Sequence, residues 1–212
     1  MGVNPELNAL QKEVTRQRIL EAGFRLFVEK NIEKVTMQDV ADEAGIGVAT
    51  VYRYYSTKLD LVMAINGWKW SEYERETARL VELRSDATAF DKFDYYLESY
   101  LNLYRNNKDL LRFNQFFNIY AEHENVSPEA MKPYTDVVTV IAGRFHQIYQ
   151  QALEDHTLST DVPERDMFWT TMHLMMAVVT RYAVGLAFKG TADPEEELRL
   201  QKNMLLREFT NR

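Results

Sequence analysis

The sequence predicts an all-α protein, and three observations lead to that fold class. Apolar residues recur with helical spacing along almost the whole chain, as in the i, i+3, i+4, i+7 series Ile19, Ala22, Gly23 and Leu26. Capping pairs, glycines and prolines interrupt this spacing at intervals that suit helix ends. The β-branched run at residues 137–141 has no second strand to pair with and lies inside a longer helical stripe.

Two helices are predicted at the front of the chain. The first apolar stripe predicts a helix over residues 9–30, and Asn31 suits the left-handed conformation that commonly ends a helix. Thr36 and Asp39 have the spacing of a capping box, in which each side chain accepts a hydrogen bond from the other residue's backbone amide. This pair predicts the start of a helix over residues 36–44.

A glycine turn joins the second of these helices to a third. Residues 45–47 read Gly-Ile-Gly and are followed by a helix expected over residues 47–54. Two short helices joined by a short turn that contains glycine are typical of a helix-turn-helix. Thr57 and Asp60 then form a second capping box, which predicts a long helix over residues 58–84.

The later helices are predicted from aromatic and aliphatic stripes and from prolines at helix starts. Proline suits the first helical turn because its missing N–H would have no partner there. Pro128 and Pro163 each open a helix, and Gly190 with Pro194 separates the last two. These features predict helices over residues 87–105, 108–122, 128–155, 164–188 and 194–210.

Composition narrows the class of protein. The 212 residues include no cysteine, so disulfides and thiolate metal sites are excluded, and the net charge is −7. Residues 1–60 carry 8 Lys and Arg against 9 Asp and Glu, so the acidic excess lies in the rest of the chain. The N-terminus lacks a secretory signal and the longest apolar stretch is too short and too polar to span a membrane. We therefore expect a cytoplasmic protein with no membrane contact.

Chemical motifs of enzymes are missing from the sequence. Its histidines, His123, His146, His156 and His173, do not have the spacing of metal ligands, and there is no GxSxG, P-loop or HExxH motif. We expect no catalytic residue, no metal and no cofactor. An enzyme is accordingly the weakest of the function classes considered.

A sequence pattern at residues 36–58 links the helix-turn-helix to a known family. The run T-x-x-D-V-A-x-E-A-G-I…T-V-Y-x-Y-Y-x-x-K resembles the tetracycline-repressor (TetR) family of transcriptional regulators. The similarity covers roughly residues 15–62 and implies a three-helix DNA-binding domain at residues 1–57. It also implies a helical domain for ligand binding and dimerisation at residues 58–212.

The resemblance implies a set of residues that contact double-stranded DNA. Hydroxyl groups and Lys58 would bind phosphates, which position a protein without reading sequence. Arg53 is the best base-reading candidate because its guanidinium matches the O6 and N7 atoms of guanine. Val48 departs from the family pattern and can make only apolar contact. The implied DNA contacts are Thr36, Gln38, Val48, Ala49, Thr50, Tyr52, Arg53, Tyr54 and Lys58.

The rest of the chain is expected to bind a small-molecule inducer and a second copy of itself. Aromatic residues crowd its helical stripes, so the inducer pocket that the resemblance implies would suit an aromatic or hydrophobic molecule. The candidate pocket residues are Tyr100, Tyr104, Phe117, Tyr120, His146, Trp169 and His173. In helix 164–188, apolar residues alternate four and three apart, as in a coiled-coil seam. The candidate dimer contacts are Phe168, Met172, Met175, Val179, Tyr182, Leu186, Leu198 and Leu205.

The sequence thus predicts a homodimeric, ligand-responsive regulator, most simply a repressor, that binds a palindromic operator. Ligand binding would change the separation of the two DNA-binding heads through helix 58–84. The alternative is a small-molecule-binding or protein-interaction module with a degenerate DNA-binding head, which Val48 and the acidic total favour.

Overall fold

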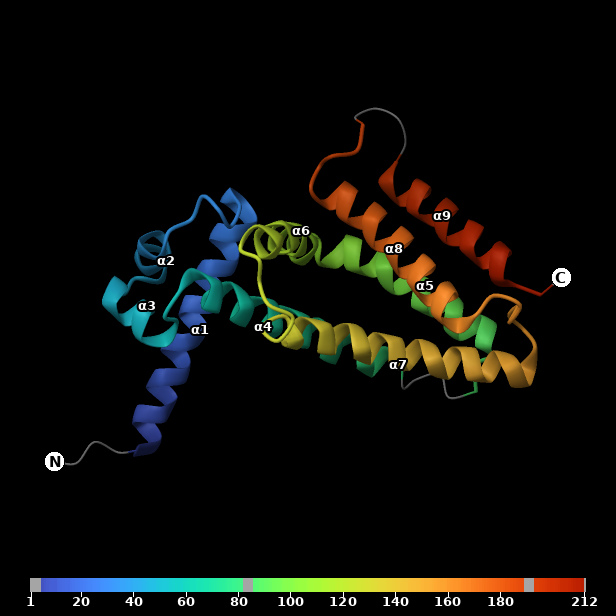
Figure 1. The fold of residues 1–212 in the computed structure, drawn as a ribbon, viewed down its shortest axis with the longest axis horizontal. Helices are drawn as coiled ribbons and strands as arrows, with labels where there is room; N and C mark the ends of the chain where they lie inside the picture. The colour runs from blue at the N-terminus through green and yellow to red at the C-terminus, as the bar shows by residue number, and fades with distance from the viewer. Residues whose placement is uncertain (1–4, 82–85, 189–192, 212) are drawn as a thin grey trace. The chain divides into compact units, whose positions relative to one another are not determined.

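The computed structural model describes residues 5–81, 86–188 and 193–211, and its regular structure in these ranges is helical (Figure 1). This confirms the all-α prediction. The helices are α1 (Pro5–Lys30), α2 (Met37–Ala44), α3 (Val48–Tyr54), α4 (Lys58–Val81), α5 (Ala89–Asn106), α6 (Lys108–His123), α7 (Lys132–Asp155), α8 (Glu164–Ala183) and α9 (Pro194–Phe209).

The predicted helix ends at the front of the chain are confirmed. Asn31 has a φ of 73° directly after α1. At the start of α2, the Thr36 amide donates to Asp39 Oδ2 at 2.7 Å and the Asp39 amide donates to Thr36 Oγ1 at 3.2 Å. Thr57 and Asp60 make the same pair of bonds at the start of α4, at 2.9 and 3.0 Å.

Three helix ends differ from the prediction by four or five residues. Helix α1 starts at Pro5 rather than at residue 9. Helix α8 ends at Ala183 rather than 188, because Gly185 takes a φ of 75° and the Leu186 amide donates back to Arg181 O at 3.0 Å. This is a left-handed helix end of the kind that glycine favours. Helix α7 starts at Lys132 rather than 128, because residues 127–131 form a separate turn. Gly190 lies outside the described residues.

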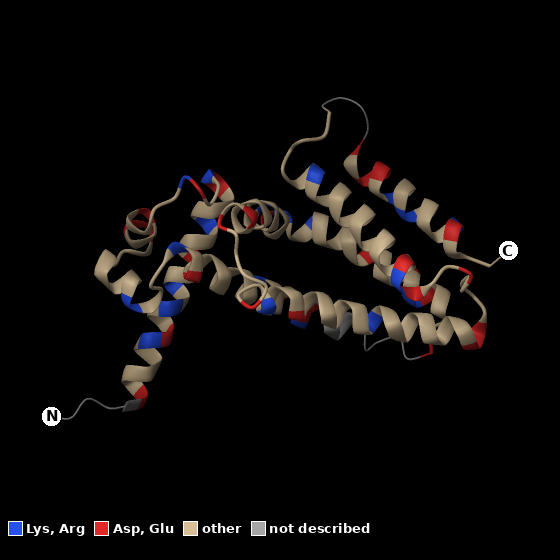
Figure 2. Ribbon diagram, in the orientation of Figure 1, with Lys and Arg blue, Asp and Glu red and all other residues tan. Residues whose placement is uncertain are grey.

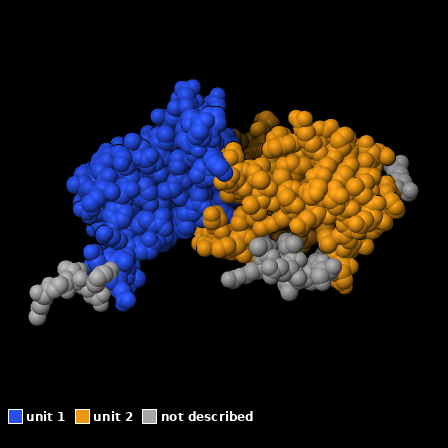
Figure 3. All heavy atoms as spheres, turned by 60° about the horizontal axis from the view of Figure 1, so that its bottom comes forward, with its two compact units in different colours: residues 1–70, 113–133 blue, residues 71–112, 134–212 orange. Residues whose placement is uncertain are grey.

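The chain forms two compact units (Figure 3). Unit 1 consists of residues 1–70 and 113–133, and unit 2 of residues 71–112 and 134–212. The compact head unit therefore includes the first half of α4 and most of α6. The predicted functional division at residues 57 and 58 stays a prediction.

The core of unit 1 joins α1, α4 and α6. The ring of Phe24 on α1 lies 6.3 Å from that of Trp68 on α4 and 5.6 Å from that of Phe113 on α6. A Cβ atom at Gly23 would come within 2.8 Å of Ile65 Cδ1, closer than side chains tolerate. A side chain at this position would require Ile65 to shift, so glycine allows α1 to approach α4 closely.

In unit 2, α5 packs against both α8 and α9. Lys202 of α9 is buried, and its ammonium group lies 2.9 Å from Asp94 Oδ1 and 2.7 Å from Glu98 Oε2 on α5. A buried cation is tolerated only when it is paired in this way. This pairing fixes which face of α9 points inward.

Candidate functional site

The helix-turn-helix of unit 1 is held by backbone contacts at its turn. Gly45 ends α2 with a φ of 63°, and its amide donates to the carbonyls of Ala41 and Asp42. Arg18 of α1 donates from Nη2 to Ala44 O at 2.5 Å, which ties the last carbonyls of α2 to α1. The turn that the two glycines predicted is therefore anchored to the helix behind it.

Helix α3 has one buried and one exposed face. Val51 is fully buried and fixes the helix to the core of unit 1. Ala49, Tyr52 and Arg53 are exposed, with half of the Tyr52 surface open to solvent. Arg53 makes no hydrogen bond or ion pair to any residue that the structure describes. Its guanidinium is thus available to an external ligand.

The start of α2 contributes polar groups to the exposed surface of unit 1. Thr36 and Gln38 are both exposed, and Gln38 Nε2 donates to Asp42 Oδ1 at 2.7 Å along the helix. Hydrogen bonds from the Thr36 side chain and backbone hold the pKa of Asp39 below its usual value, so this cap remains ionised at neutral pH. Thr36 is thereby held in a fixed position.

The remaining α3 residues of the predicted set are partly covered. Val48 and Thr50 are half-buried. Tyr54 is also half-buried, and its hydroxyl donates to the backbone oxygen of Lys12 on α1 at 3.2 Å. This bond fixes α3 against α1 and leaves Tyr54 less free for an external contact than Tyr52.

The structure gives Lys58 a contact within the chain that the sequence did not predict. We expected its charge to face a phosphate, but its Nζ donates to the carbonyls of Ile32, Glu33 and Val35, at 3.0, 3.4 and 3.3 Å. The same ammonium group lies 5.2 Å from the centre of the Tyr120 ring. Lys58 therefore holds the loop between α1 and α2, because those carbonyls lie beyond the end of α1 and need donors.

We expect Lys58→Met to destabilise the fold and to spare DNA binding. The substitution keeps the length of the side chain and removes the ammonium group that three carbonyls share. The free energy of unfolding should fall by about 1–2 kcal/mol, near the lower end for hydrogen bonds to a charged group because Lys58 is partly exposed. Urea unfolding measures this, with the exposed Lys34→Met as control. Equal stability of the two variants would contradict the assigned role.

The candidate ligand residues fall into buried and exposed groups. Tyr100 and Tyr104 are buried in unit 2, and Phe117 and Tyr120 are buried in unit 1. The other three are exposed. The His146 ring lies 3.0 Å from Glu164 Oε2, and the Trp169 ring stacks 5.3 Å from that of His173. In this structure these three side chains lie at the surface. For Trp169 and His173, apolar residues on both faces of α8 had left the orientation of the helix open.

Sequence reasoning missed the partner of Tyr100. The hydroxyl groups of Tyr96 and Tyr100 lie 2.6 Å apart, and the Tyr96 ring packs 5.4 Å from that of Phe145. Burial raises the pKa of both phenols, so they stay neutral at physiological pH. The i, i+4 spacing of the two tyrosines is the signal that could have revealed the pair.

Most residues of the predicted dimer interface are buried in the core of the single chain. Met172 and Tyr182 are half-buried and Leu186 is exposed. The other five predicted contacts are buried within the chain itself and cannot touch a partner in this conformation: Phe168, Met175, Val179, Leu198 and Leu205. A heptad-like spacing shows that a helix face is covered, but it does not distinguish the chain's own core from a second copy.

The opposite face of α8 is exposed and uncharged. Its outward residues are Trp169, Thr170, His173, Leu174 and Ala177, and no Asp, Glu, Lys or Arg occurs between residues 167 and 180. Figure 2 shows this as an uncoloured stretch between charges near the two ends of the helix. Leu200 and Met204 on the neighbouring α9 are also about 60% exposed. Unit 2 thus presents apolar side chains on two adjacent helices.

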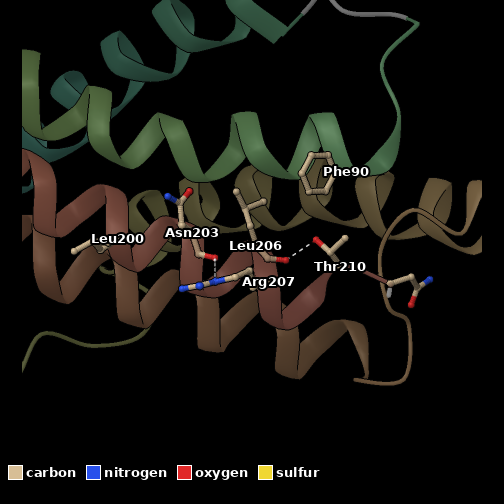
Figure 4. A pocket seen from close by; sticks show the side chains of 7 residues that line it. Phe90, Leu200, Asn203, Leu206, Arg207 and Thr210 are labelled. Carbon is tan, nitrogen blue, oxygen red and sulfur yellow. Dashed lines mark hydrogen bonds between the residues drawn. The ribbon is translucent and has the colours of Figure 1, made fainter.

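A surface pocket of about 580 Å³ lies along α9 and is also lined by Phe90 of α5 (Figure 4). Arg207 Nε donates to Asn203 O and Thr210 Oγ1 to Leu206 O, so these polar groups are engaged within the helix and its end. None of the predicted ligand residues lines this pocket. Its lining consists of Phe90, Leu200, Asn203, Leu206, Arg207, Thr210 and Asn211.

The described residues include neither a cluster of potential metal ligands nor a helix suited to span a membrane. No group of three or more histidine, aspartate or glutamate side chains is placed to hold a metal ion there. No helix in the same ranges combines the length and the apolar character that a membrane span requires.

Comparisons of sequence identify relatives of the front of the chain. Residues 19–65 match the family described as bacterial regulatory proteins, tetR family. The HTH-type transcriptional repressor KstR of Mycobacterium tuberculosis is 31% identical over 90 residues, which are 42% of this chain and 40% of that protein. An HTH-type transcriptional regulator of Staphylococcus aureus is 46% identical over 46 residues, or 22% and 25% of the two chains. The chain thus spans less than half the length of these relatives.

Comparisons of structure extend over nearly the whole chain and concern the fold. A transcriptional regulator from Saccharomonospora viridis, solved in complex with choline, has a TM-score of 0.75 at 18% identity and covers 94% of this chain and 100% of that one. FadR of Bacillus subtilis, solved with stearoyl-CoA, has a TM-score of 0.70 at 14% identity and covers 90% and 97%.

Proposed function

We propose that this chain, which belongs through residues 19–65 to the tetR family of bacterial regulatory proteins, is a ligand-responsive repressor of transcription. It binds a palindromic operator as a homodimer and leaves it when a small molecule binds. The observation that carries the proposal is the exposed face of α3, where Tyr52 and the unpaired Arg53 stand beside the small Ala49.

The proposed DNA contacts follow from this exposure. Helix α3 enters the major groove, where Arg53 reads a guanine and Val48 and Ala49 contact base edges or thymine methyl groups. The hydroxyls of Thr50 and Tyr52 bind phosphates, and Gln38 reaches the backbone or a base edge. The Thr36 hydroxyl joins them by turning from Asp39 Oδ2, to which it donates at 2.6 Å in the free chain. Tyr54 lines the groove wall while it holds α3 to α1. Lys58 is left out of the contact set because its ammonium group is engaged within unit 1.

Dimerisation is proposed through the exposed face of α8 and the neighbouring side of α9. Over residues 169–177 of α8 this surface carries no Asp, Glu, Lys or Arg, and Trp169, Leu174 and Ala177 make much of it apolar, which is unusual for a helix face in water. A two-fold axis would pair the surface with itself and produce an isologous interface. The resulting dimer presents two heads to two half-sites, which in helix-turn-helix dimers lie about 34–36 Å apart.

The proposed signal is a small aromatic or hydrophobic molecule. Two structural neighbours were solved with choline and with stearoyl-CoA, which supports ligand binding by this fold without identifying the ligand here. Helix α4 begins in unit 1 and continues into unit 2, so it provides a continuous link along the chain. Ligand binding then shifts an equilibrium between head arrangements that do and do not match the operator.

Selection of bound duplexes from a random pool tests this function directly. We expect enrichment of an inverted repeat whose half-sites are about one helical turn apart. The recovered operator then serves to measure affinity with and without candidate ligands. Enrichment of no sequence, or unchanged operator affinity with ligands that demonstrably bind, would contradict the proposal.

The rival function is a small-molecule-binding or protein-interaction module whose head no longer reads DNA. The inward Lys58 and the net charge of −7 favour it. The two functions differ in salt dependence, because binding to phosphates releases counterions. For a DNA reader we expect the association constant for duplex to fall steeply with salt, with a shallower slope for Arg53→Ala. A salt-independent, sequence-independent association measured by fluorescence anisotropy would favour the rival.

A further inference from the structure

Two buried carboxamides stand out in the core of unit 1. Asn66 of α4 is 1% exposed and Asn114 of α6 is 4% exposed. Both amide atoms of Asn66, and Oδ1 of Asn114, lack a hydrogen-bond partner among the described residues. The other buried side chains described in this unit are hydrophobic or aromatic. These two amides are therefore polar exceptions in an apolar core.

An unpaired amide in such a core has an energetic cost. Each buried donor or acceptor without a partner destabilises a protein by about 1–3 kcal/mol. The great majority of buried polar side-chain atoms in proteins are consequently paired with protein or with a bound molecule. For helix packing alone, leucine would be more favourable than asparagine at both positions. Something other than packing must account for asparagine there.

The two helices that carry these amides converge on the same part of α1. Asn66 directly follows Ile65, which lies against Gly23, and Asn114 directly follows Phe113, which contacts Phe24. Lys58 at the start of α4 lies over the Tyr120 ring of α6. Both carboxamides are thus buried in unit 1, on helices whose adjacent residues contact Gly23 and Phe24 of α1.

We propose that Asn66 and Asn114 bind the neutral polar group of a small, otherwise apolar ligand within unit 1. This rests on the proposed ligand response and specifies its chemistry. A carboxamide offers two donors and one acceptor oxygen, so it pairs best with a group that both donates and accepts, such as a hydroxyl or a primary amide. The other buried side chains of unit 1 are hydrophobic or aromatic, Phe113 and Ile65 among them, and suit an apolar remainder.

The charges of unit 1 argue for a neutral ligand group. No charged side chain is buried among the described residues of this unit. The ammonium group of Lys58 is engaged by carbonyls, and that of Lys69 lies 4.9 and 4.8 Å from the ring centres of Phe24 and Trp68. A buried carboxylate or ammonium on the ligand would lack a counter-ion and would be strongly disfavoured.

The test compares four benzene derivatives of similar size on the full chain. Benzamide and benzyl alcohol carry a neutral group that donates and accepts, whereas benzoate and benzylamine are charged at neutral pH. We expect the two neutral probes to raise the midpoint of thermal unfolding and the two charged probes to leave it unchanged. An absence of any shift, or an equal shift by all four, would overturn the proposal.

Substitution of the carboxamides completes the test. In Asn66→Leu and Asn114→Leu we expect an unfolding midpoint equal to or above that of the parent, because an unpaired amide has been removed. The affinity for benzamide should fall by roughly tenfold, as for one lost hydrogen bond. Asn118→Leu is the matched control, since Asn118 is exposed one turn from Asn114 on α6. This control should keep the affinity for benzamide.

The outcomes distinguish this inference from the proposed function. If both leucine variants unfold at lower temperature than the Asn118→Leu control, the amides have structural partners and the ligand subsite is excluded. Operator binding by the unsubstituted chain is measured separately. If the chain binds no duplex, the proposed repressor function is contradicted. The effect of the probes on thermal unfolding would still test the proposed role of the two carboxamides.

Discussion

Arg53→Ala is expected to weaken operator binding by about 5- to 150-fold for each half-site, which corresponds to about 1–3 kcal/mol per bidentate contact with guanine. The reason is that Arg53 is exposed on α3 and has no partner within the described chain. Its loss removes an interaction with the duplex without removing one from the fold. Unfolding by urea should therefore be unchanged. Titration of the selected operator, followed by fluorescence anisotropy, measures the affinity.

A matched control separates base reading from a general change in charge. Arg75 is an exposed arginine of unit 2, and Arg75→Ala removes the same charge outside the head. Operator affinity should be close to that of the parent in this control. The affinity should also be measured for operators in which one base pair at a time is changed. The Arg53→Ala variant should lose its preference for guanine at one of these positions. Equal losses for the two alanine variants would refute a reading role for Arg53.

Ala177→Glu should convert the dimer into a monomer and abolish tight operator binding. Ala177 is small and exposed on the uncharged face of α8, so the fold of one chain loses no packing. In a two-fold interface each substitution brings two carboxylates into an apolar environment without counter-ions, which costs several kcal/mol. We expect the dissociation constant of the dimer to rise by at least about a hundredfold. Sedimentation equilibrium measures it.

The control for this substitution adds the same charge elsewhere. Ala130 is exposed in the turn before α7, and Ala130→Glu should remain dimeric. The urea midpoint of unfolding should not depend on protein concentration for Ala177→Glu, because this variant unfolds as a monomer. For the dimeric parent the urea midpoint should rise as the protein concentration rises. A dimer that persists in Ala177→Glu would place the interface on another surface.

The sequence was most informative where local chemistry decides the structure. Asn31 ends α1, the Thr36–Asp39 and Thr57–Asp60 pairs open α2 and α4, and the glycine turn follows α2 as predicted. Each of these features depends on a few neighbouring residues and their backbone conformations. The sequence of a single protein can therefore reveal these helix ends and turns without knowledge of the tertiary fold.

Predictions that depended on tertiary context were less successful. Periodicity identified Phe168 and Val179 as one apolar stripe of α8 but could not show that this stripe is buried within the chain itself. The family pattern placed Lys58 at a phosphate, while the structure places its ammonium group at carbonyls 23 to 26 residues earlier. Such long-range pairings have no signature in the local sequence.

The three carbonyls that share Lys58 have a practical consequence for chimeric regulators. A graft that takes the reading head up to Thr57 and fuses it to a foreign sensor would leave the lysine behind, and the loop before α2 would lose its cation. A transplant should instead carry α4 to Trp70 together with residues 113–133, the segment that supplies Tyr120 beneath the lysine. The natural cutting point for modular engineering therefore lies well beyond the last residue of the helix-turn-helix.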